Sequence, residues 1–418
     1  MLTSMRQRWT RMLQTAWWPA VPLLMIQVLS GMVYMPQNTF FPIYLEERLG
    51  FSTVALSALV AAGQVAGMVA GIVAGFLSDV LGSKWMLVTG IAGIALTSLA
   101  FVIPLPAVVA VLWVMNGIAI GFHTLGGQSY LTRVSDPAYL GLLSGLYELT
   151  LTLGGALGSP GLGILLDRQG FAAFGIVLFL ACLLTAIVAV FFIPNTRAAA
   201  GACGQQAPRP SREHILAVLR RPAVPVLVAL RFLPTIFYGM ATVLIPLLIN
   251  RLTGSKTSVA VYGTVSLILA SAGQLVAGRA ADRWGSRWPT LISFGLIAAS
   301  AAGLWIFSGQ LWGVFLFGVI GYATAWALAA LMLCLVSASV PSHEHGGVLG
   351  LLHGAWCIGM VAGSLIGGAL TRIATGLPFL VSGILNLGAI ALTVWFFSKF
   401  VTLPVAEGGV PEIGTRHT

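Results

Sequence analysis

Long apolar runs follow one another along almost the whole of this 418-residue chain. A helix that crosses a membrane needs about 20 mostly apolar residues, and the sequence supplies about twelve such runs. Charged residues make up only 8% of the chain, whereas soluble domains carry about 25%. So few charges cannot cover a water-exposed surface, and the sequence predicts an all-α, multi-pass integral membrane protein embedded in lipid. The runs lie at roughly 18–44, 53–78, 85–103, 106–130, 139–165, 171–193, 223–250, 258–278, 288–308, 311–338, 346–371 and 376–399.

Basic residues are distributed unevenly among the polar segments between these runs. If the N-terminus is cytoplasmic, the cytoplasmic segments hold fifteen Lys and Arg residues and the outer loops hold five. An excess of positive charge on the cytoplasmic side is typical of membrane proteins. We therefore expect both termini in the cytoplasm. The net charge of +10 then reflects topology rather than nucleic-acid binding.

The second half of the chain repeats the first at a nearly constant spacing. The stretch GFLSDVLGSKW begins at Gly75, and GRAADRWGSRW begins 203 residues later at Gly278. The motif PAVP also occurs twice, at 19–22 and 222–225. A repeat found in separate elements indicates a duplicated six-helix unit, with both copies starting on the same side of the membrane. The sequence predicts two six-helix bundles at 1–193 and 223–400, a cytoplasmic linker at 194–222 and a cytoplasmic tail at 401–418.

These features resemble the major facilitator superfamily of transporters, whose loop between the second and third helices reads G-x-x-x-D-x-x-G-R/K-R/K. The chain carries this loop twice, each time with one basic residue replaced by serine. The resemblance implies alternating access, with two loops that latch the halves together in one transport state. It also implies a transporter rather than an enzyme, with no cofactor. The loop residues are Gly75, Asp79, Gly82 and Lys84, and Gly278, Asp282, Arg283, Gly285 and Arg287.

A ladder of glycine residues recurs in the fifth helix of each half. Small residues at helical spacing let helices pack closely in lipid. The ladder also resembles the motif of the antiporter branches of the superfamily, in which G-P usually follows the third glycine. Here the proline is one residue late in the first half and absent from the second. The helix-packing residues are Gly145, Gly154, Gly158, Pro160 and Gly163, and Gly350, Gly359, Gly363, Gly367 and Gly368.

Four ionisable residues lie inside the predicted spans, where such residues usually face a cavity or a partner. Glu148 and Arg231 both lie roughly 13 Å from the cytoplasmic ends of their helices. His353 occupies the position equivalent to Glu148, and His123 lies in the fourth span. All four are candidates for substrate binding or proton coupling, with Glu148 the preferred protonatable group and His353 its alternative. A buried Glu148–Arg231 pair that only holds the halves together is the structural alternative.

Polar and small residues form a stripe along the first helix, and the stripe recurs 204 residues later along the seventh. Residues at this spacing lie on one helix face. A polar face that is repeated on apolar helices indicates the wall of a central cavity. The candidate cavity-lining residues are Gln27, Tyr34, Asn38, Asn116, Thr152, Thr235, Tyr238, Trp326 and Trp356.

These features favour a monomeric secondary transporter of a prokaryotic inner membrane. The preferred function is proton-coupled export of a small amphipathic organic compound by antiport. The arginine that drug:proton antiporters of the family usually carry in the fourth helix is missing, so their coupling scheme does not transfer directly.

Three alternatives to this function remain. The first is uptake or facilitated transport of a small polar metabolite, such as a sugar or an organic anion. A non-transporting receptor or assembly subunit is the second. An enzyme is the third, but no catalytic dyad is visible, and His343 and His345 lie in a polar loop that favours solvation over a metal site.

Overall fold

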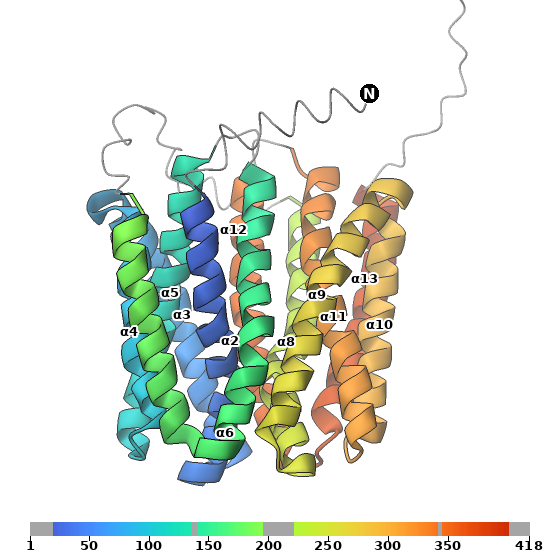
Figure 1. The fold of residues 1–418 in the computed structure, drawn as a ribbon. Coiled ribbons are helices and arrows are strands. Elements are labelled where there is room, and N and C mark those ends of the chain that lie inside the picture. The colour runs from blue at the N-terminus through green and yellow to red at the C-terminus, as the bar shows by residue number, and fades with distance from the viewer. Residues whose placement is uncertain (1–19, 136–139, 195–220, 342–344, 401–418) are drawn as a thin grey trace, which may run out of the picture.

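The computed structural model describes residues 20–135, 140–194, 221–341 and 345–400. Almost all of them lie in long helices packed side by side (Figure 1), and these four ranges contain no β-strand. The predicted all-α architecture is therefore confirmed. The first half, residues 20–194, contains α2 (Val21–Leu49), α3 (Thr53–Leu81), α4 (Ser83–Ser98), the 3₁₀ helix η1 (Leu99–Phe101), α5 (Pro106–Val134) and α6 (Leu140–Phe192). The second half, residues 221–400, contains α8 (Ala223–Thr253), α9 (Lys256–Trp284), α10 (Arg287–Phe307), α11 (Leu311–Ser339), α12 (His345–Leu370) and α13 (Leu377–Phe400).

Ten of these helices are long and apolar enough to cross a membrane, which makes the chain a multi-pass integral membrane protein. One of the ten, α6, consists of two arms that reverse direction at Gly170, where φ is 77° and ψ is −175° (Figure 1). Glycine suits these angles because it has no side chain to clash with the backbone. The helix α2, which contains three charged residues and three amide side chains, is not among the ten. The count of twelve spans stays a prediction.

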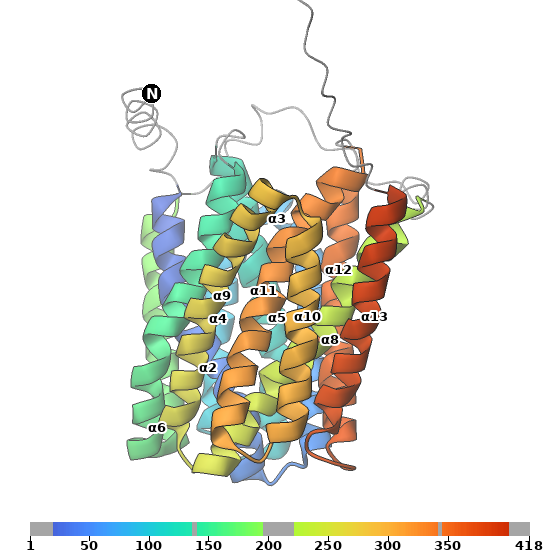
Figure 2. The ribbon, with the colours of Figure 1, turned by 90° about the vertical axis from the view of Figure 1, so that its right-hand side faces the viewer.

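Successive helices run in opposite directions, so their ends form two opposite faces of the bundle (Figures 1 and 2). One face, here called the linker end, contains residues 20, 194, 221 and 400. The other face, here called the closed end, contains the α2–α3 turn, the α8–α9 turn and the reversal of α6. Both ends of the described chain therefore lie on the same face, while the predicted linker and tail fall almost wholly outside the described residues.

The two halves build similar turns at the closed end, of three residues after α2 and of two residues after α8. Gly50 ends α2 with φ at 65°, and Gly254, 204 residues later, ends α8 with φ at 66°. Two residues farther on, the Ser52 hydroxyl accepts a hydrogen bond from a backbone N–H of α3. Ser255 does the same for α9. Serine is a favourable N-cap because its hydroxyl satisfies an N–H that has no partner within the helix.

Glycine residues let α2 cross α6 at very short distance, and let α8 cross α12 in the same way. A Cβ atom at Gly154 would lie 2.1 Å from the backbone oxygen of Val28. At the equivalent crossing, a Cβ atom at Gly359 would lie 3.1 Å from the oxygen of Phe232, and one at Gly363 only 2.3 Å from that of Ile236. These positions have little or no room for a side chain, so the equivalent helix pairs of the two halves pack through the same residues.

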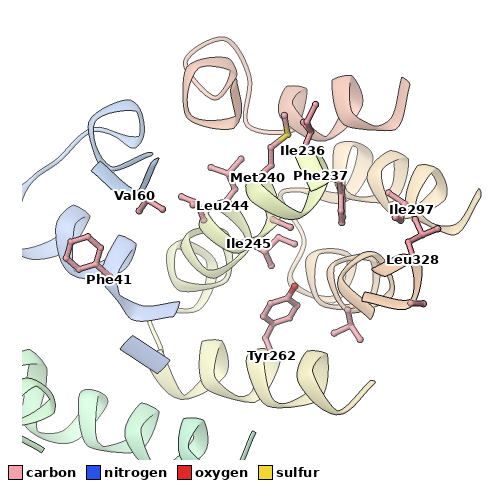
Figure 3. Close-up of a cluster of buried hydrophobic side chains, with 14 of the residues drawn as sticks. Phe41, Val60, Ile236, Phe237, Met240, Leu244, Ile245, Tyr262, Ile297 and Leu328 are labelled. Carbon is pink, nitrogen blue, oxygen red and sulfur yellow. The ribbon is translucent and has the colours of Figure 1, made fainter. Parts of the chain in front are cut away.

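A continuous apolar core joins the halves near the closed end (Figure 3). Phe41 and Val60 of the first half belong to the same cluster of buried side chains as Met240 and Leu244 of α8. Phe41 also stacks on Trp113 of α5, with ring centroids 3.4 Å apart. The buried apolar area at this end favours contact between the halves.

Candidate functional site

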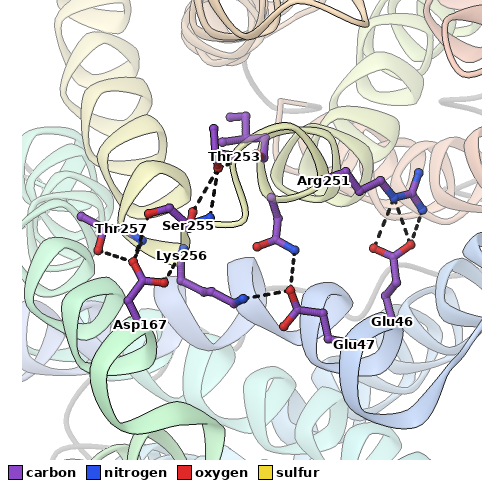
Figure 4. Close-up of polar contacts among 10 residues, drawn as sticks. Glu46, Glu47, Asp167, Arg251, Thr253, Ser255, Lys256 and Thr257 are labelled. Atoms are coloured by element: carbon purple, nitrogen blue, oxygen red, sulfur yellow. Dashed lines mark hydrogen bonds and ion pairs between the residues drawn. The ribbon is translucent and has the colours of Figure 1, made fainter.

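Charged and amide side chains join the two halves at the closed end (Figure 4). Arg251, near the end of α8, forms an ion pair with Glu46, near the end of α2, and its Nε donates to both carboxylate oxygens at 3.0 and 3.2 Å. Glu47 accepts hydrogen bonds from the Asn250 amide and from Lys256 Nζ, each at 2.8 Å. The first half supplies the acids of this junction, and the second half supplies the bases and the amide.

These contacts follow the pseudo-two-fold relation between the halves. Glu46 and Asn250 are equivalent positions 204 residues apart, and so are Glu47 and Arg251. The contacts are crossed. Glu46 binds Arg251, which is the equivalent of Glu47. Glu47 binds Asn250, which is the equivalent of Glu46. This reciprocal arrangement is typical of an interface that surrounds a two-fold axis.

A further acid of the first half caps a helix of the second. Asp167, at the end of the first arm of α6, accepts from the backbone N–H groups of Lys256 and Thr257 at 2.8 and 2.9 Å. It also accepts from the hydroxyls of Ser255 and Thr257. A carboxylate at a helix N-terminus satisfies free N–H groups and interacts favourably with the helix dipole. The equivalent position in the second half is Arg372, which has no acceptor for such contacts.

Contacts between α6 and α9 continue from the closed end toward the middle of the bundle. Thr264 Oγ1 donates to the backbone oxygen of Ala156 at 3.2 Å. The hydroxyls of Thr152 and Ser271 lie 3.1 Å apart. The predicted cavity residue Thr152 therefore takes part in the junction between the halves.

Glu148 lies one helical turn beyond Thr152, on the side of the linker end. Its side chain is half-buried and lies near Gln128 and within electrostatic range of Tyr34. It forms no ion pair with any residue in the described ranges. A carboxylate so placed remains available to a proton or to a ligand.

Arg231 lies at a comparable depth in the second half. It is half-buried, and Tyr238, Cys357 and His353 are within electrostatic range of its guanidinium group. His353 is exposed and stacks on Trp356, with ring centroids 5.6 Å apart. Within the described part of the chain Arg231 has no ion-pair partner, so the structure does not contain the Glu148–Arg231 pair considered as an alternative above.

An aromatic group lies near both charged side chains. The hydroxyls of Tyr238 and Tyr322 are 3.0 Å apart, and Trp326 meets Tyr238 edge to face at a centroid distance of 6.0 Å. Tyr34, the equivalent of Tyr238 in the first half, lies within electrostatic range of both tyrosines. Tyr322 was not among the residues predicted from sequence. Its spacing of four residues from Trp326 on α11 places both on one helix face and could have revealed it.

Several predicted site residues have contacts only within their own half. His123 is buried, and its backbone packs on Gly90 of α4. The buried Asn116 Oδ1 accepts from Thr97 Oγ1 at 2.9 Å and from Gln37 Nε2 at 3.3 Å. These two residues thus connect helices of the first half.

The remaining predicted residues are placed along α2 and α8. Gln27 is buried beside Tyr147 of α6. Asn38 Nδ2 donates to the backbone oxygen of Tyr34, and Thr235 Oγ1 donates to that of Arg231. Asn38 and Thr235 therefore satisfy their polar groups on their own helices.

The two loops that carry the family motif adopt the same backbone form at the linker end. Gly82 and Gly285 have φ values of 93° and 77°, in the region that favours glycine. Lys84 Nζ donates to the backbone oxygen of Val190 at 2.7 Å, within the first half. Asp79 lies in α3, and its side chain is not among those that the structure describes.

The second loop is more exposed than the first. Asp282 and Arg283 are exposed, and Arg283 and Arg287 each lie over the tryptophan that follows them in sequence. A Cβ atom at Gly75 or Gly278 would meet no neighbour within 4 Å. The contacts described for each loop are thus with residues of its own half.

No group of three or more His, Cys, Asp or Glu residues that could hold a metal ion occurs in the described ranges. The site instead combines a carboxylate, a guanidinium group and aromatic rings. Such a combination can bind organic molecules and exchange protons.

Comparison with known proteins places this architecture in a family. The sequence model of the Major Facilitator Superfamily matches residues 23–333 and again residues 227–415. A "Tetracycline resistance protein, class H" from Pasteurella multocida is 26% identical over 180 residues, which are 42% of this chain and 44% of that protein. The match thus spans less than half the length of that relative.

A solved structure has the same fold. The nucleoside transporter NupG, as its D323A mutant, superimposes with a TM-score of 0.75 over 90% of this chain and 99% of that chain, at 15% sequence identity. The starts of the two family matches, 23 and 227, are also separated by the 204-residue spacing of the internal repeat. The chain belongs to the Major Facilitator Superfamily and is a membrane transporter.

Proposed function

We propose that this transporter exports a small amphipathic organic compound in exchange for protons. The observation that carries the proposal is the position of Glu148, which is half-buried beside aromatic rings and has no ion-pair partner among the described residues. A cation bound beside a carboxyl group favours its ionised form, so a cationic substrate would displace the proton. Competition of substrate and proton for one carboxyl group couples their movements in opposite directions.

The contacts between the halves support alternating access. Within the described ranges, the hydrogen bonds between the halves lie at the closed end and reach as far as Thr152 and Ser271. Glu148 and Arg231 lie on the linker side of that pair. With the linker end in the cytoplasm, as proposed from the charge distribution, this is the state that takes up substrate from the cytoplasm. The tetracycline resistance relative is in keeping with export of an amphipathic compound.

Uptake of a small organic anion is the second candidate, and one observation favours it. Arg231 is also half-buried without an ion-pair partner in the described ranges, and a guanidinium group binds carboxylates and phosphates well. In that case the anion would bind Arg231, and Glu148 would have a structural role. The superposition on a nucleoside transporter is in keeping with a polar substrate.

Proton flux in reconstituted vesicles distinguishes the two functions. Purified protein in liposomes that contain a pH-sensitive dye is exposed to candidate amines, sugars and organic acids under an imposed pH gradient. Proton-coupled export predicts that a substrate triggers proton movement opposite to its own, and that Glu148→Gln abolishes it. Glu407→Gln, which removes a carboxyl group from the C-terminal tail, is the matched control and should transport normally. Substrate equilibration without proton movement would overturn the proposal.

A further inference from the structure

Two pairs of helices cross between the halves at the closed end, α6 with α9 and α3 with α12. The repeat relates these two crossings, because positions in α3 recur 203 residues later in α9, and positions in α6 recur 205 residues later in α12. The crossings therefore lie on opposite sides of the pseudo-two-fold axis and flank the crossed contacts of Glu46 and Glu47. We call them the α6–α9 crossing and the α3–α12 crossing.

The helices approach each other equally closely at both crossings. A Cβ atom at Gly163 of α6 would lie 2.5 Å from the Cβ of Ala260 in α9. At the equivalent point, a Cβ atom at Gly368 of α12 would lie 2.5 Å from the Cβ of Ser57 in α3. The nearest atoms to both glycines belong to the other half, whereas those nearest to Gly363 belong to its own half. Steric fit thus closes both sides of the junction in the same way.

Hydrogen bonds reinforce the α6–α9 crossing at three levels. The Asp167 carboxylate accepts from two backbone N–H groups and two hydroxyls at the start of α9 (Figure 4). Farther from the closed end, the Thr264 hydroxyl donates to a backbone oxygen of α6. Deeper still, the hydroxyls of Thr152 and Ser271 lie 3.1 Å apart. Separation of α6 from α9 therefore breaks several hydrogen bonds.

The α3–α12 crossing lacks the groups for these bonds. An arginine occupies the position equivalent to the carboxylate, and apolar or sulfur-containing side chains occupy those equivalent to the three hydroxyls. The four residues are Arg372, Ala61, Cys357 and Met68. Arginine accepts no hydrogen bond, and thiol and thioether groups bond only weakly. Within the described part of the chain, no hydrogen bond joins any of the four to the opposite helix of this crossing.

Two hydroxyl groups of α3 lie near this crossing, and neither bonds to α12. Ser57 is 1% exposed, and its Oγ has no hydrogen-bond partner among the described residues. Thr53 Oγ1 accepts from Arg251, which belongs to α8. A buried hydroxyl without a partner is unfavourable, and separation of α3 from α12 would let water reach Ser57. Hydrogen bonds therefore hold one side of the junction, while packing alone holds α3 against α12 on the other.

We propose that the closed end opens by separation of α3 from α12, while the α6–α9 crossing stays in contact and acts as the pivot. Substrate then passes on the side of α3 and α12. In a symmetric rocking of the halves, by contrast, both crossings would separate equally. This inference goes beyond the proposed function, because it holds for either direction of transport and for any substrate.

The rate at which a buried cysteine is modified measures how often each crossing opens. Ser57→Cys and Ala260→Cys place a thiol at equivalent positions, each 1% exposed in the closed arrangement. Both are made in a background whose four native cysteines are replaced by alanine. The protein in lipid nanodiscs is treated with a charged maleimide that does not enter lipid. Each rate is divided by that of the same variant unfolded in detergent, and Ala55→Cys, which is exposed, is the accessible control.

We expect Ser57→Cys to react roughly tenfold faster than Ala260→Cys, which is the effect of about one net hydrogen bond. The thiol at 260 adds an atom beside Gly163, so any strain that it causes would work against this result. Equal rates, or a faster reaction at position 260, would overturn the inference. Absence of reaction at both positions, with normal reaction of Ala55→Cys, would overturn it too, because neither crossing would then open.

A second variant tests the cause of the difference. Asp167→Ala removes hydrogen bonds from the α6–α9 crossing alone, so it should raise the rate at position 260 severalfold and leave the rate at position 57 unchanged. Arg168→Ala, which removes a neighbouring exposed side chain, is the matched control and should change neither rate. If Asp167→Ala leaves the rate at position 260 unchanged, the hydrogen bonds do not make this crossing the pivot.

These measurements use neither a substrate nor a proton gradient, so they are independent of the proposed function. If both positions react equally while Glu148→Gln abolishes proton exchange, proton-coupled export stands and the α6–α9 pivot is wrong. If position 57 reacts faster but no substrate moves protons, the pivot stands and proton-coupled export is wrong.

Discussion

The guanidinium group of Arg251 binds the carboxylate of Glu46 across the boundary between the halves, 205 residues away in sequence. The equivalent pair of positions is also in contact, because Glu47, the equivalent of Arg251, accepts a hydrogen bond from Asn250, the equivalent of Glu46. These contacts bind the closed end of the bundle and oppose its opening. We therefore expect these contacts to favour the state of the transporter in which this end is closed.

Replacement of Arg251 by Gln should shift the molecule toward the state in which the closed end is open. A partly exposed ion pair contributes about 0.2–1 kcal/mol, so the open population should rise by up to about fivefold. Spin labels on Leu105 and Leu311, which are exposed at the closed end, would report this as a longer distance in double electron–electron resonance. Arg48→Gln is the matched control, since Arg48 lies over Phe171 of its own half. An unchanged distance distribution in Arg251→Gln would contradict a role in closure.

Removal of the Asp167 carboxylate should destabilise the protein. Asp167→Ala deprives two backbone N–H groups at the start of α9 of their acceptor, and loss of an N-cap costs about 0.5–2 kcal/mol. The midpoint of thermal unfolding in detergent should fall by about 2–4 °C per kcal/mol for a unit of the size of one half. Arg168→Ala, one residue away and also exposed, should change the midpoint much less. Equal effects of both variants would show that the cap is not important.

The glycine residues of the ladder should differ sharply in their tolerance of a methyl group. Gly363→Ala should disrupt folding, because a Cβ atom there would lie 2.3 Å from the backbone oxygen of Ile236, and overpacking in a well-packed region costs about 1–3 kcal/mol or more. Gly350→Ala in the same helix should be tolerated, because nothing lies within 4 Å of its Cβ position. Size-exclusion profiles of the two variants after mild detergent extraction measure the difference.

Gly285→Ala should slow or impair transport through the backbone of its loop. Its φ of 77° and ψ of 161° lie in a region used almost only by glycine, and an L-residue there costs about 1–3 kcal/mol. Gly278→Ala, seven residues earlier in the same motif, has a helical backbone and free space and serves as the control. Initial transport rates in proteoliposomes, normalised to the amount of reconstituted protein, compare the two. Equal rates would mean that the loop can adopt another conformation without loss.

Asn116→Leu should lower stability and leave substrate preference unchanged. The substitution removes the acceptor of the Gln37 amide and one of the two acceptors of the Thr97 hydroxyl, which keeps the backbone oxygen of Ile94. A buried donor left without a partner, as the Gln37 amide would be, costs about 1–3 kcal/mol. Thermal unfolding measures the loss, and the ranking of transported compounds tests selectivity. A changed ranking at unaltered stability would instead place Asn116 in the substrate cavity, as its position in the sequence predicts.

The helical architecture follows from the sequence because apolar runs in lipid have few alternatives to helices. The repeat could also be predicted, since duplicated glycines such as Gly50 and Gly254 end equivalent helices with the same positive φ. The crossed contacts at the closed end could not, because Glu46 and Arg251 lie at the ends of two predicted spans and nothing in their spacing indicates that they meet. Sequence predicts which face of a helix is polar but not which helix that face contacts.

The central site illustrates the same limit. Glu148 and Arg231 stand out in sequence because charges are rare in apolar spans. His123 has the same signature, yet it is buried against α4. Tyr322 has no such signature, although its hydroxyl contacts that of Tyr238. Aromatic residues are common in membrane helices, so their number and spacing alone do not distinguish a substrate surface from ordinary packing.

The crossed contacts at the closed end also bear on the origin of the single chain. In a symmetric dimer of two identical first halves, Glu46 of one copy would face Glu47 of the other, and two carboxylates would repel each other. Complementary charges at equivalent positions therefore require two copies whose sequences differ, and the two halves of this chain differ at these positions. The difference between the halves thus provides an electrostatic closure that two identical copies could not form.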